Sequence, residues 1–182
     1  MSHGHKFRPE TRHVPKALDK IYLRVVWQRE PIVIRALDGS RVISKCSNVF
    51  SSFIQAEFNN LNLSDWQTPE TPVKIFKNVA DGTFFKIFNS LPGCWDEKYF
   101  NQDQIIAFCE DNPELIDSEK AVIFLCIINP EENIIESRPH ENLIIVSVSR
   151  DKDGLMVDKD SLDRPTVWPK EVVNLFVVPK YQ

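Results

Sequence analysis

The side chains that carry most enzyme and metal chemistry are present in this chain without the spacing that known sites require. Three of the four histidines lie within the first 13 residues. Met1, Ser2 and His3 have the amine–X–His order that can bind Cu²⁺ or Ni²⁺, but Ser2 is small enough for an aminopeptidase to remove Met1 and destroy that order. His140 has no cysteine or second histidine near it in the sequence. We therefore expect no metal site.

Carboxylates could support acid–base catalysis if two of them shared a sheltered cleft. The acidic pairs at 96–97, 110–111 and 131–132 fall in expected turns or helix ends, where solvated carboxylates are routine. The DKDG sequence at 151–154 is superficially like a calcium loop, but its glycine comes too early for an EF-hand, and a β-turn explains it better. The chain has no Gly-x-Ser-x-Gly elbow. We expect no cofactor and favour a protein that is not an enzyme.

Three aromatic residues, Trp95, Tyr99 and Phe100, lie between two expected helices and close to charged side chains. Aromatic residues at a helix junction usually cover a core. A partly exposed Trp/Tyr pair flanked by charge is also typical of a binding surface. We favour the core interpretation and keep these three residues as the candidate binding site.

Charge is unevenly distributed along the chain. The net charge is −4, yet the first 30 residues hold seven Lys and Arg against three acids. Lys6, Arg8, Arg12 and Lys16 are therefore candidate contacts to nucleic-acid phosphates. The alternative, which we favour, is that this basic segment folds back on the acidic remainder of its own chain.

The cysteines and the apolar runs indicate the compartment. The four cysteines have no CxxC pairing, and three lie within apolar patterns; we expect them to be reduced and mostly buried. No apolar run approaches the roughly 20 residues of a membrane span, and the N-terminal segment lacks the apolar region of a secretory signal. These features predict a cytoplasmic protein without membrane contact.

From residue 47 onward, helices are expected in three places. Apolar residues at near-helical spacing predict helices over 47–58 and 84–91. A further helix is expected to begin at Asn101, whose side chain can accept from the free N–H groups of the first turn. Gln104, three residues later, can complete a capping box.

Strands dominate the last third of the sequence. The continuous apolar run 121–128 is short enough to be a central strand covered on both faces. Further strands are expected at 143–149, 155–157 and 172–178, after a short extended piece at 72–76. Because short turns separate these strands, we expect them to be antiparallel neighbours.

The N-terminal third is less regular. Apolar residues in 14–25 recur at helical spacing, whereas 21–27 is rich in β-branched and aromatic residues, so we expect a short helix followed by a strand and leave 21–27 open. Segments 31–36 and 41–43 flank Asp38-Gly39, which predicts a hairpin.

From 72 to 179 the sequence resembles a family of small uncharacterised bacterial proteins. In that family a DGTF…IF.SL helix precedes a TQ.QII.F helix, an apolar strand follows, and a Trp precedes a terminal VVVP. The matching residues are Asp81, Gly82, Thr83, Phe84, Ile87, Phe88, Ser90, Leu91, Gln102, Gln104, Ile105, Ile106, Phe108, Phe124, Leu125, Trp168, Val177, Val178 and Pro179. Asn101 replaces the Thr of the family, which exchanges one good N-cap for another. The resemblance implies a shared fold and no particular activity.

Together these patterns predict an α+β protein in which an antiparallel β-sheet packs against two or three short helices. Residues 1–13 are expected to form a flexible basic tail and residues 14–182 a single domain. The function that we favour is a non-catalytic module that binds a protein partner or a second copy of itself. A nucleic-acid-associated protein is the alternative, and an enzyme whose site is assembled only by the fold is the third.

Overall fold

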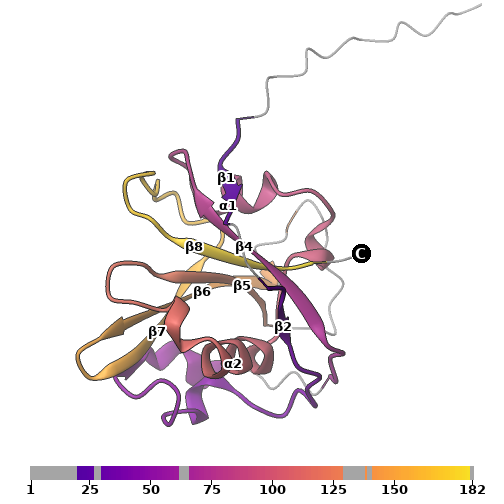
Figure 1. The fold of residues 1–182 in the computed structure, drawn as a ribbon, viewed down its shortest axis with the longest axis vertical. Helices are drawn as coiled ribbons and strands as arrows, with labels where there is room; N and C mark the ends of the chain where they lie inside the picture. The colour runs from indigo at the N-terminus through magenta and orange to yellow at the C-terminus, as the bar shows by residue number, and fades with distance from the viewer. Residues whose placement is uncertain (1–19, 27–29, 62–65, 129–137, 139–140, 181–182) are drawn as a thin grey trace, which may run out of the picture.

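The computed structural model describes residues 20–26, 30–61, 66–128, 138 and 141–180 (Figure 1). Its strands are β1 (Leu23–Val25), β2 (Ile32–Ile34), β3 (Phe53–Ile54), β4 (Thr71–Asn78), β5 (Val122–Ile127), β6 (Leu143–Asp151), β7 (Gly154–Ser161) and β8 (Leu175–Pro179). The α-helices are α1 (Phe84–Asn89) and α2 (Gln102–Asp111), and the short 3₁₀ helices are η1 (Ile43–Lys45), η2 (Ala56–Asn60), η3 (Trp95–Glu97) and η4 (Pro113–Leu115). The expected tail 1–13 lies outside the described residues.

One mixed sheet contains all eight strands. Its order is β1-β4-β8-β5-β6-β7-β3, and β2 pairs with β4 as well. The α+β architecture is confirmed, but the purely antiparallel sheet is wrong: β8 runs parallel to β5, and β3 runs parallel to β7. β8 does not pair with β7, which precedes it in the chain. It inserts instead between β4 and β5, because the long connection after β7 allows it to cross the sheet.

β5 is the central strand, and all six of its residues are buried. Its side chains alternate between two hydrophobic clusters. Phe124 belongs to the cluster that contains the buried residues of α2, and Leu125 belongs to the cluster that contains those of α1. The two helices therefore cover opposite faces of the sheet (Figure 1). The prediction of a central strand covered on both faces is confirmed.

Both α-helices begin where side chains cap them. In α1 the Thr83 hydroxyl accepts from the Lys86 N–H at 3.3 Å. In α2 Asn101 Oδ1 accepts from the Gln104 N–H at 2.8 Å, and Gln104 Oε1 accepts from the Asn101 N–H at 3.1 Å. The predicted capping box is thus confirmed, and it satisfies buried donors that the first turn leaves without helical partners.

The hairpin predicted around Asp38-Gly39 is wrong. Gly39 does adopt the positive φ of a tight turn (78°), but η1 follows it and β2 pairs with β4. The segment lies on α2, because Asp103 accepts from the Gly39 N–H and Gln102 accepts from the Ile43 N–H. Tertiary contacts therefore replace the cross-strand partner that a hairpin would have supplied.

The helix predicted over 47–58 is also wrong. The segment 21–27, which the sequence left open between helix and strand, forms strand β1 in its described part. Phe50 and Phe58 are buried as their spacing suggested. Between them, however, β3 pairs with β7, the Ser52 and Gln55 N–H groups donate to β7 carbonyls, and only the 3₁₀ helix η2 follows from Ala56. Unsatisfied edge groups of β7 thus outweigh a weak helical pattern.

Gly82, Phe84 and Trp168, on which the expected resemblance to a bacterial family partly rests, meet beside α1. The backbones of Gly82 and Trp168 exchange hydrogen bonds of 3.2 and 2.9 Å, and the Trp168 ring lies 5.0 Å from that of Phe84. A side chain at position 82 would clash with the Tyr22 ring, 2.8 Å from an added Cβ. These residues therefore have packing roles.

No helix of the described part is long and apolar enough to cross a bilayer.

Loss of the α2 cap tests the capping box. Asn101→Ala removes the acceptor for a buried N–H, so we expect the free energy of unfolding to fall by about 1 kcal/mol. Asn101→Thr restores a hydroxyl acceptor and should recover most of that loss. Urea denaturation of both variants measures the difference, and an unchanged midpoint for Asn101→Ala would contradict the cap.

The central position of β5 can be tested by truncating its largest side chain, Phe124. Phe124 is fully buried and its ring lies 5.9 Å from Phe100 and 5.2 Å from Phe108. Phe124→Ala should therefore cost about 3–5 kcal/mol. The control is Phe53→Ala on the edge strand β3, where 47% of the residue is exposed; we expect less than about 1 kcal/mol there. Urea denaturation measures both variants. If Phe124→Ala and Phe53→Ala lower the free energy of unfolding by the same amount, the central position of β5 is contradicted.

Candidate functional site

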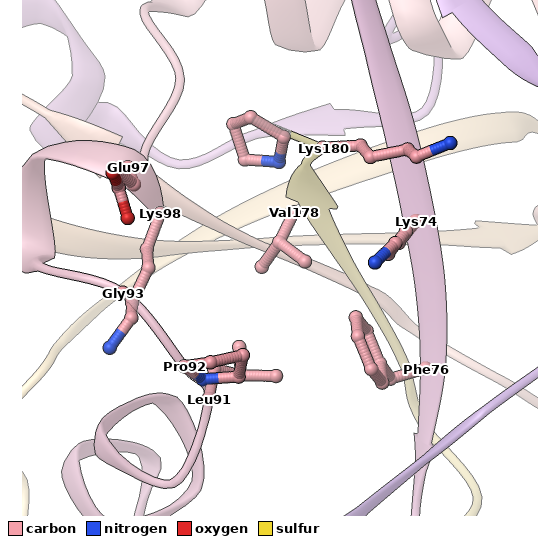
Figure 2. Close-up of a pocket in the computed structure, with 10 residues that line it drawn as sticks. Lys74, Phe76, Leu91, Pro92, Gly93, Glu97, Lys98, Val178 and Lys180 are labelled. Carbon is pink, nitrogen blue, oxygen red and sulfur yellow. The ribbon is translucent and has the colours of Figure 1, made fainter. Parts of the chain in front are cut away.

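A pocket of about 240 Å³ lies on the α1 face of the sheet, between the α1–η3 connection and strands β4 and β8 (Figure 2). Its lining combines basic, apolar and backbone surface. The lining residues are Lys74, Phe76, Leu91, Pro92, Gly93, Glu97, Lys98, Val178, Pro179 and Lys180. Three separate segments of the chain thus build one small site.

Lysines from three elements meet around this pocket. Lys74 of β4 is paired with Val178 of β8, so both side chains point to the α1 face. Figure 2 shows the Lys74 ammonium directed into the pocket and Lys98 along the opposite wall. Lys180 follows β8 directly and is exposed, with its side chain running outward past Lys74.

Lys98 is an unusual lysine because only 4% of it is exposed. Its Nζ atom lies 5.1 Å from the centre of the Trp95 ring, a cation–π distance. The predicted aromatic junction therefore contributes to the site through the lysine that it holds. A desolvated ammonium interacts more strongly with a negative charge than one in water does.

The floor of the pocket is apolar. Phe76 is half-buried and is paired with Phe176 of β8, whose ring packs against Phe84 and Phe88 of α1. Val178 lies at the centre of the view in Figure 2, with Phe76 beside it. α1 does not reach this far, because the chain leaves the helix before Leu91. The floor is therefore open to a ligand.

Glu97 is the acidic residue of the lining, and its carboxylate is held by the backbone. Its Oε2 accepts from the Cys94 N–H at 3.2 Å, which caps η3. Gly93 has a φ of 87°, and a Cβ there would lie 2.1 Å from Glu97 Oε2. Glycine thus permits the close turn that brings this wall to the pocket. The lining contains no histidine, cysteine or serine, so it offers no nucleophile–base pair.

The three predicted binding residues take different positions. Trp95 is buried and lies 5.5 Å from Phe85, whereas Tyr99 is half-buried and lies 6.1 Å from Trp66. Phe100 is fully buried, and its backbone hydrogen bonds to β5. Phe100 offers no surface to a partner. None of the three lines the pocket, whereas Glu97 and Lys98, which lie between Trp95 and Tyr99 in the chain, form one of its walls.

Sequence reasoning missed Lys74 and Lys180, because nothing in the spacing of either residue connects it with Lys98. Their meeting depends on the pairing of β4 with β8. The candidate nucleic-acid contacts, Lys6, Arg8, Arg12 and Lys16, lie outside the described residues.

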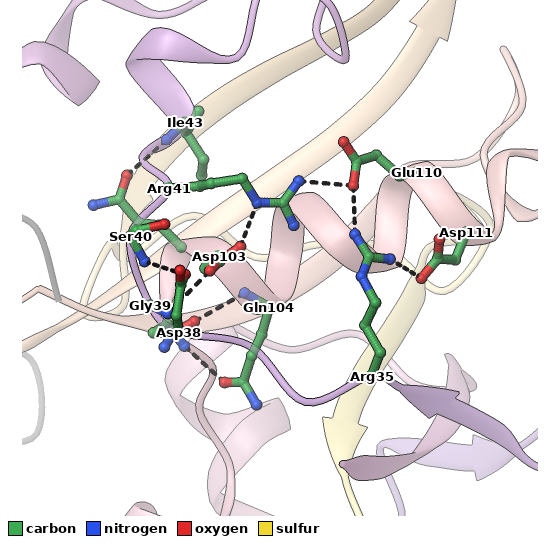
Figure 3. A network of polar contacts seen from close by, with 12 residues as sticks. Arg35, Asp38, Gly39, Ser40, Arg41, Ile43, Asp103, Gln104, Glu110 and Asp111 are labelled. Carbon is green, nitrogen blue, oxygen red and sulfur yellow. Dashed lines mark hydrogen bonds and ion pairs between the residues drawn. The ribbon is translucent and has the colours of Figure 1, made fainter. Parts of the chain in front are cut away.

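A second polar cluster lies on the opposite face of the sheet, along α2 (Figure 3). Arg41 joins Asp103 at 2.6 Å and Glu110 at 2.8 Å, and Arg35 joins Glu110 at 2.9 Å and also Asp111. Burial alone would raise the pKa of Glu110, but the hydrogen bonds from Arg41 and Arg35 outweigh it and lower that pKa. The contribution of Glu110 to stability is therefore complete at neutral pH and is lost as the pH falls through the lowered pKa.

This second cluster fixes the chain rather than offering a site. Its carboxylates are already paired with guanidinium groups, and Asp103 is only 1% exposed at its side chain. It attaches the segment that contains Arg35 and Arg41 to α2. A nearby pocket of about 300 Å³ includes Glu110 and Arg150, but Arg150 already donates to the carbonyls of Ile116 and Pro113.

Two buried thiols are unreactive. Burial raises the pKa of Cys126 to about 12 and raises that of Cys109 well above its usual range. Both are therefore protonated at neutral pH and are poor nucleophiles and metal ligands. Among the described residues no three His, Cys, Asp or Glu side chains are grouped as a metal site would require.

Comparison of the chain with models of protein families, with curated sequences and with solved structures finds no match. The resemblance to a bacterial family therefore stays a prediction. Function has to be argued from the pocket itself.

The structural role of the α2 cluster can be tested at Asp103. Asp103→Ala leaves the Gly39 N–H and the Arg41 guanidinium without a buried acceptor, so we expect a loss of about 3 kcal/mol in unfolding free energy. The control is Asp111→Ala on the same helix, where both partners of the ion pair are about half exposed; a loss below about 1 kcal/mol is expected. Urea denaturation measures both variants. If Asp103→Ala and Asp111→Ala lower the free energy of unfolding by similar amounts, the cluster does not depend on Asp103.

Proposed function

We propose that this protein is a non-catalytic binding module that holds an anionic group of a partner or ligand in the pocket between α1–η3 and strands β4 and β8. The observation that supports this most is the position of Lys74 and Lys98 on opposite walls above an apolar floor. A binding site commonly combines such a floor with a few charged groups that fix orientation.

The charge of the whole chain supports the same function. The net charge is −4, whereas the lining of the pocket holds three lysines against Glu97. A concentrated positive site on an acidic protein attracts small anions and acidic segments while the remaining surface repels them. We therefore expect anions to bind at this pocket in preference to the rest of the surface.

Binding is favoured over catalysis because the lining offers charge and apolar surface without an acid–base pair. A nucleic-acid function through the basic N-terminal segment stays a prediction, since its residues lie outside the described part. We also propose a cytoplasmic location, because the four cysteines are unpaired and free thiols suit a reducing compartment.

Anion binding can be measured by NMR titration of the full chain with acetate, sulfate and phosphate at low ionic strength. We expect saturable shifts at the backbone amides of Gly93 and Lys98. Lys74→Gln should weaken the binding about tenfold, because it removes one charge-assisted contact.

The matched control is Lys77→Gln. Lys77 lies on the same strand and is also exposed, but it is out of phase with Lys74 and points to the other face. It should leave the affinity unchanged. If the pocket amides do not move with any of the three anions, or if both variants weaken binding equally, the proposal fails.

A further inference from the structure

We propose that the outer edge of β1 takes up an extended segment of a partner protein as an additional strand, and that this segment carries an acidic residue between two apolar ones. This surface is separate from the anion pocket and does not depend on it. Two features of β1 support the proposal: its free backbone groups and the different character of its two faces.

The edge of β1 is open to a further strand. β1 stands at one end of the strand order, and β4 is its partner among the described strands (Figure 1). The Tyr22 carbonyl and the Val26 N–H both hydrogen-bond, at 2.8 Å, to β4 and the residue that follows it. Because residues of a strand alternate between its two sides, the backbone of Arg24 also faces β4, and the backbone groups of Leu23 and Val25 face outward. Each of these two residues can exchange both of its hydrogen bonds with an added strand.

The α1 face of this edge is apolar. Val25 is 56% exposed and is paired with Phe76, and Leu23 belongs to the hydrophobic cluster of α1. Ile21, directly before β1, is 73% exposed. An exposed apolar residue on an edge strand favours pairing with another chain. Apolar side chains of an added strand would therefore pack beside Leu23 and Val25.

The α2 face of the same edge is basic. Arg24 and Lys77 are paired across β1 and β4, and both are exposed. Like charges directly opposite each other destabilise a pair of strands, and neither residue has an ion pair within the described part of the chain. An acidic residue of an added strand, placed opposite Arg24, would relieve this repulsion. Since side chains alternate between faces, the incoming segment has the order apolar, acidic, apolar.

Charge also favours a partner protein over a second copy of this chain. The first 30 residues hold seven Lys and Arg against three acids. Antiparallel pairing of β1 with itself about Arg24 would put two guanidinium groups opposite each other. An acidic segment of another protein meets no such repulsion. In this mode of recognition the main-chain hydrogen bonds supply affinity and the alternating side chains supply specificity.

NMR titration with short synthetic peptides tests the added strand. The capped peptide Thr-Val-Glu-Val-Thr has the required order, and Thr-Val-Lys-Val-Thr is its matched control. We expect the glutamate peptide to shift the Leu23 and Val25 amides saturably, and the lysine peptide to bind about tenfold more weakly. N-methylation of both valines of the peptide should abolish binding, because their N–H groups face β1. N-methylation of the glutamate, whose N–H faces away, should weaken binding far less.

A charge reversal tests the contact to Arg24. Arg24→Glu should reverse the preference, so that the lysine peptide binds about tenfold more tightly than the glutamate peptide. Lys152→Glu is the control, because it makes the same change of charge at an exposed position in the turn between β6 and β7. It should leave both affinities unchanged. The comparison of peptides on the natural chain needs no variant, so it tests the proposal even if Arg24→Glu does not fold.

Several results would overturn the proposal. Equal affinity of the glutamate and lysine peptides would contradict the acidic residue, and equal effects of the two N-methylations would contradict the added strand. The proposal also fails if millimolar peptide leaves the Leu23 and Val25 amides unmoved. If these amides shift with protein concentration alone, a second copy occupies the edge instead of a partner protein. The anion pocket is read separately, at the Gly93 and Lys98 amides.

Discussion

The burial of β5 on both faces is the constraint on which the rest of the structure depends. Its six apolar residues alternate between two hydrophobic clusters, so each face of the sheet needs its own cover. α2 with η1 and η2 covers one face, and α1 with η3 covers the other. Neighbouring strands on both sides, β8 and β6, satisfy the backbone groups of β5. A sheet with one solvated face would leave half of β5 exposed to water.

The two covers are unequal, and this inequality produces the pocket. α2 has ten residues and is fixed at its start by a capping box. α1 has six residues and ends before Leu91. The part of β4 and β8 that α1 does not reach carries Lys74, Phe76 and Val178 on the same face. The turn after α1 then brings Lys98 over that uncovered surface.

Charged residues have different roles on the two faces. On the α2 face, Arg35 and Arg41 are paired with carboxylates of the helix, and these pairs attach an irregular segment of the chain. On the α1 face, the lysines outnumber the acids, and Glu97 is bound to a backbone N–H. Charged residues thus attach a chain segment on the α2 face, and basic residues gather around a pocket on the α1 face.

The sequence by itself determined the elements whose signals are local. The cap at Asn101, the apolar faces of α1 and α2, and the turn between β6 and β7 all depend on residues within a few positions of one another. The continuous apolar run of β5 also predicted a strand covered on both faces. These patterns report on backbone hydrogen bonds and side-chain periodicity, which neighbouring residues largely decide.

Only the tertiary structure decided the order and direction of the strands and the site that follows from them. The insertion of β8 between β4 and β5 cannot be predicted from residues that are close in the sequence. The apolar residues in 47–58 have helical spacing, but the segment pairs with β7 instead. The Asp38-Gly39 turn likewise formed without its expected hairpin, because α2 supplied the acceptors. Lys74, Lys98 and Lys180 line one pocket for the same reason: they are far apart in the sequence, the pairing of β4 with β8 brings Lys74 and Lys180 together, and the turn after α1 adds Lys98.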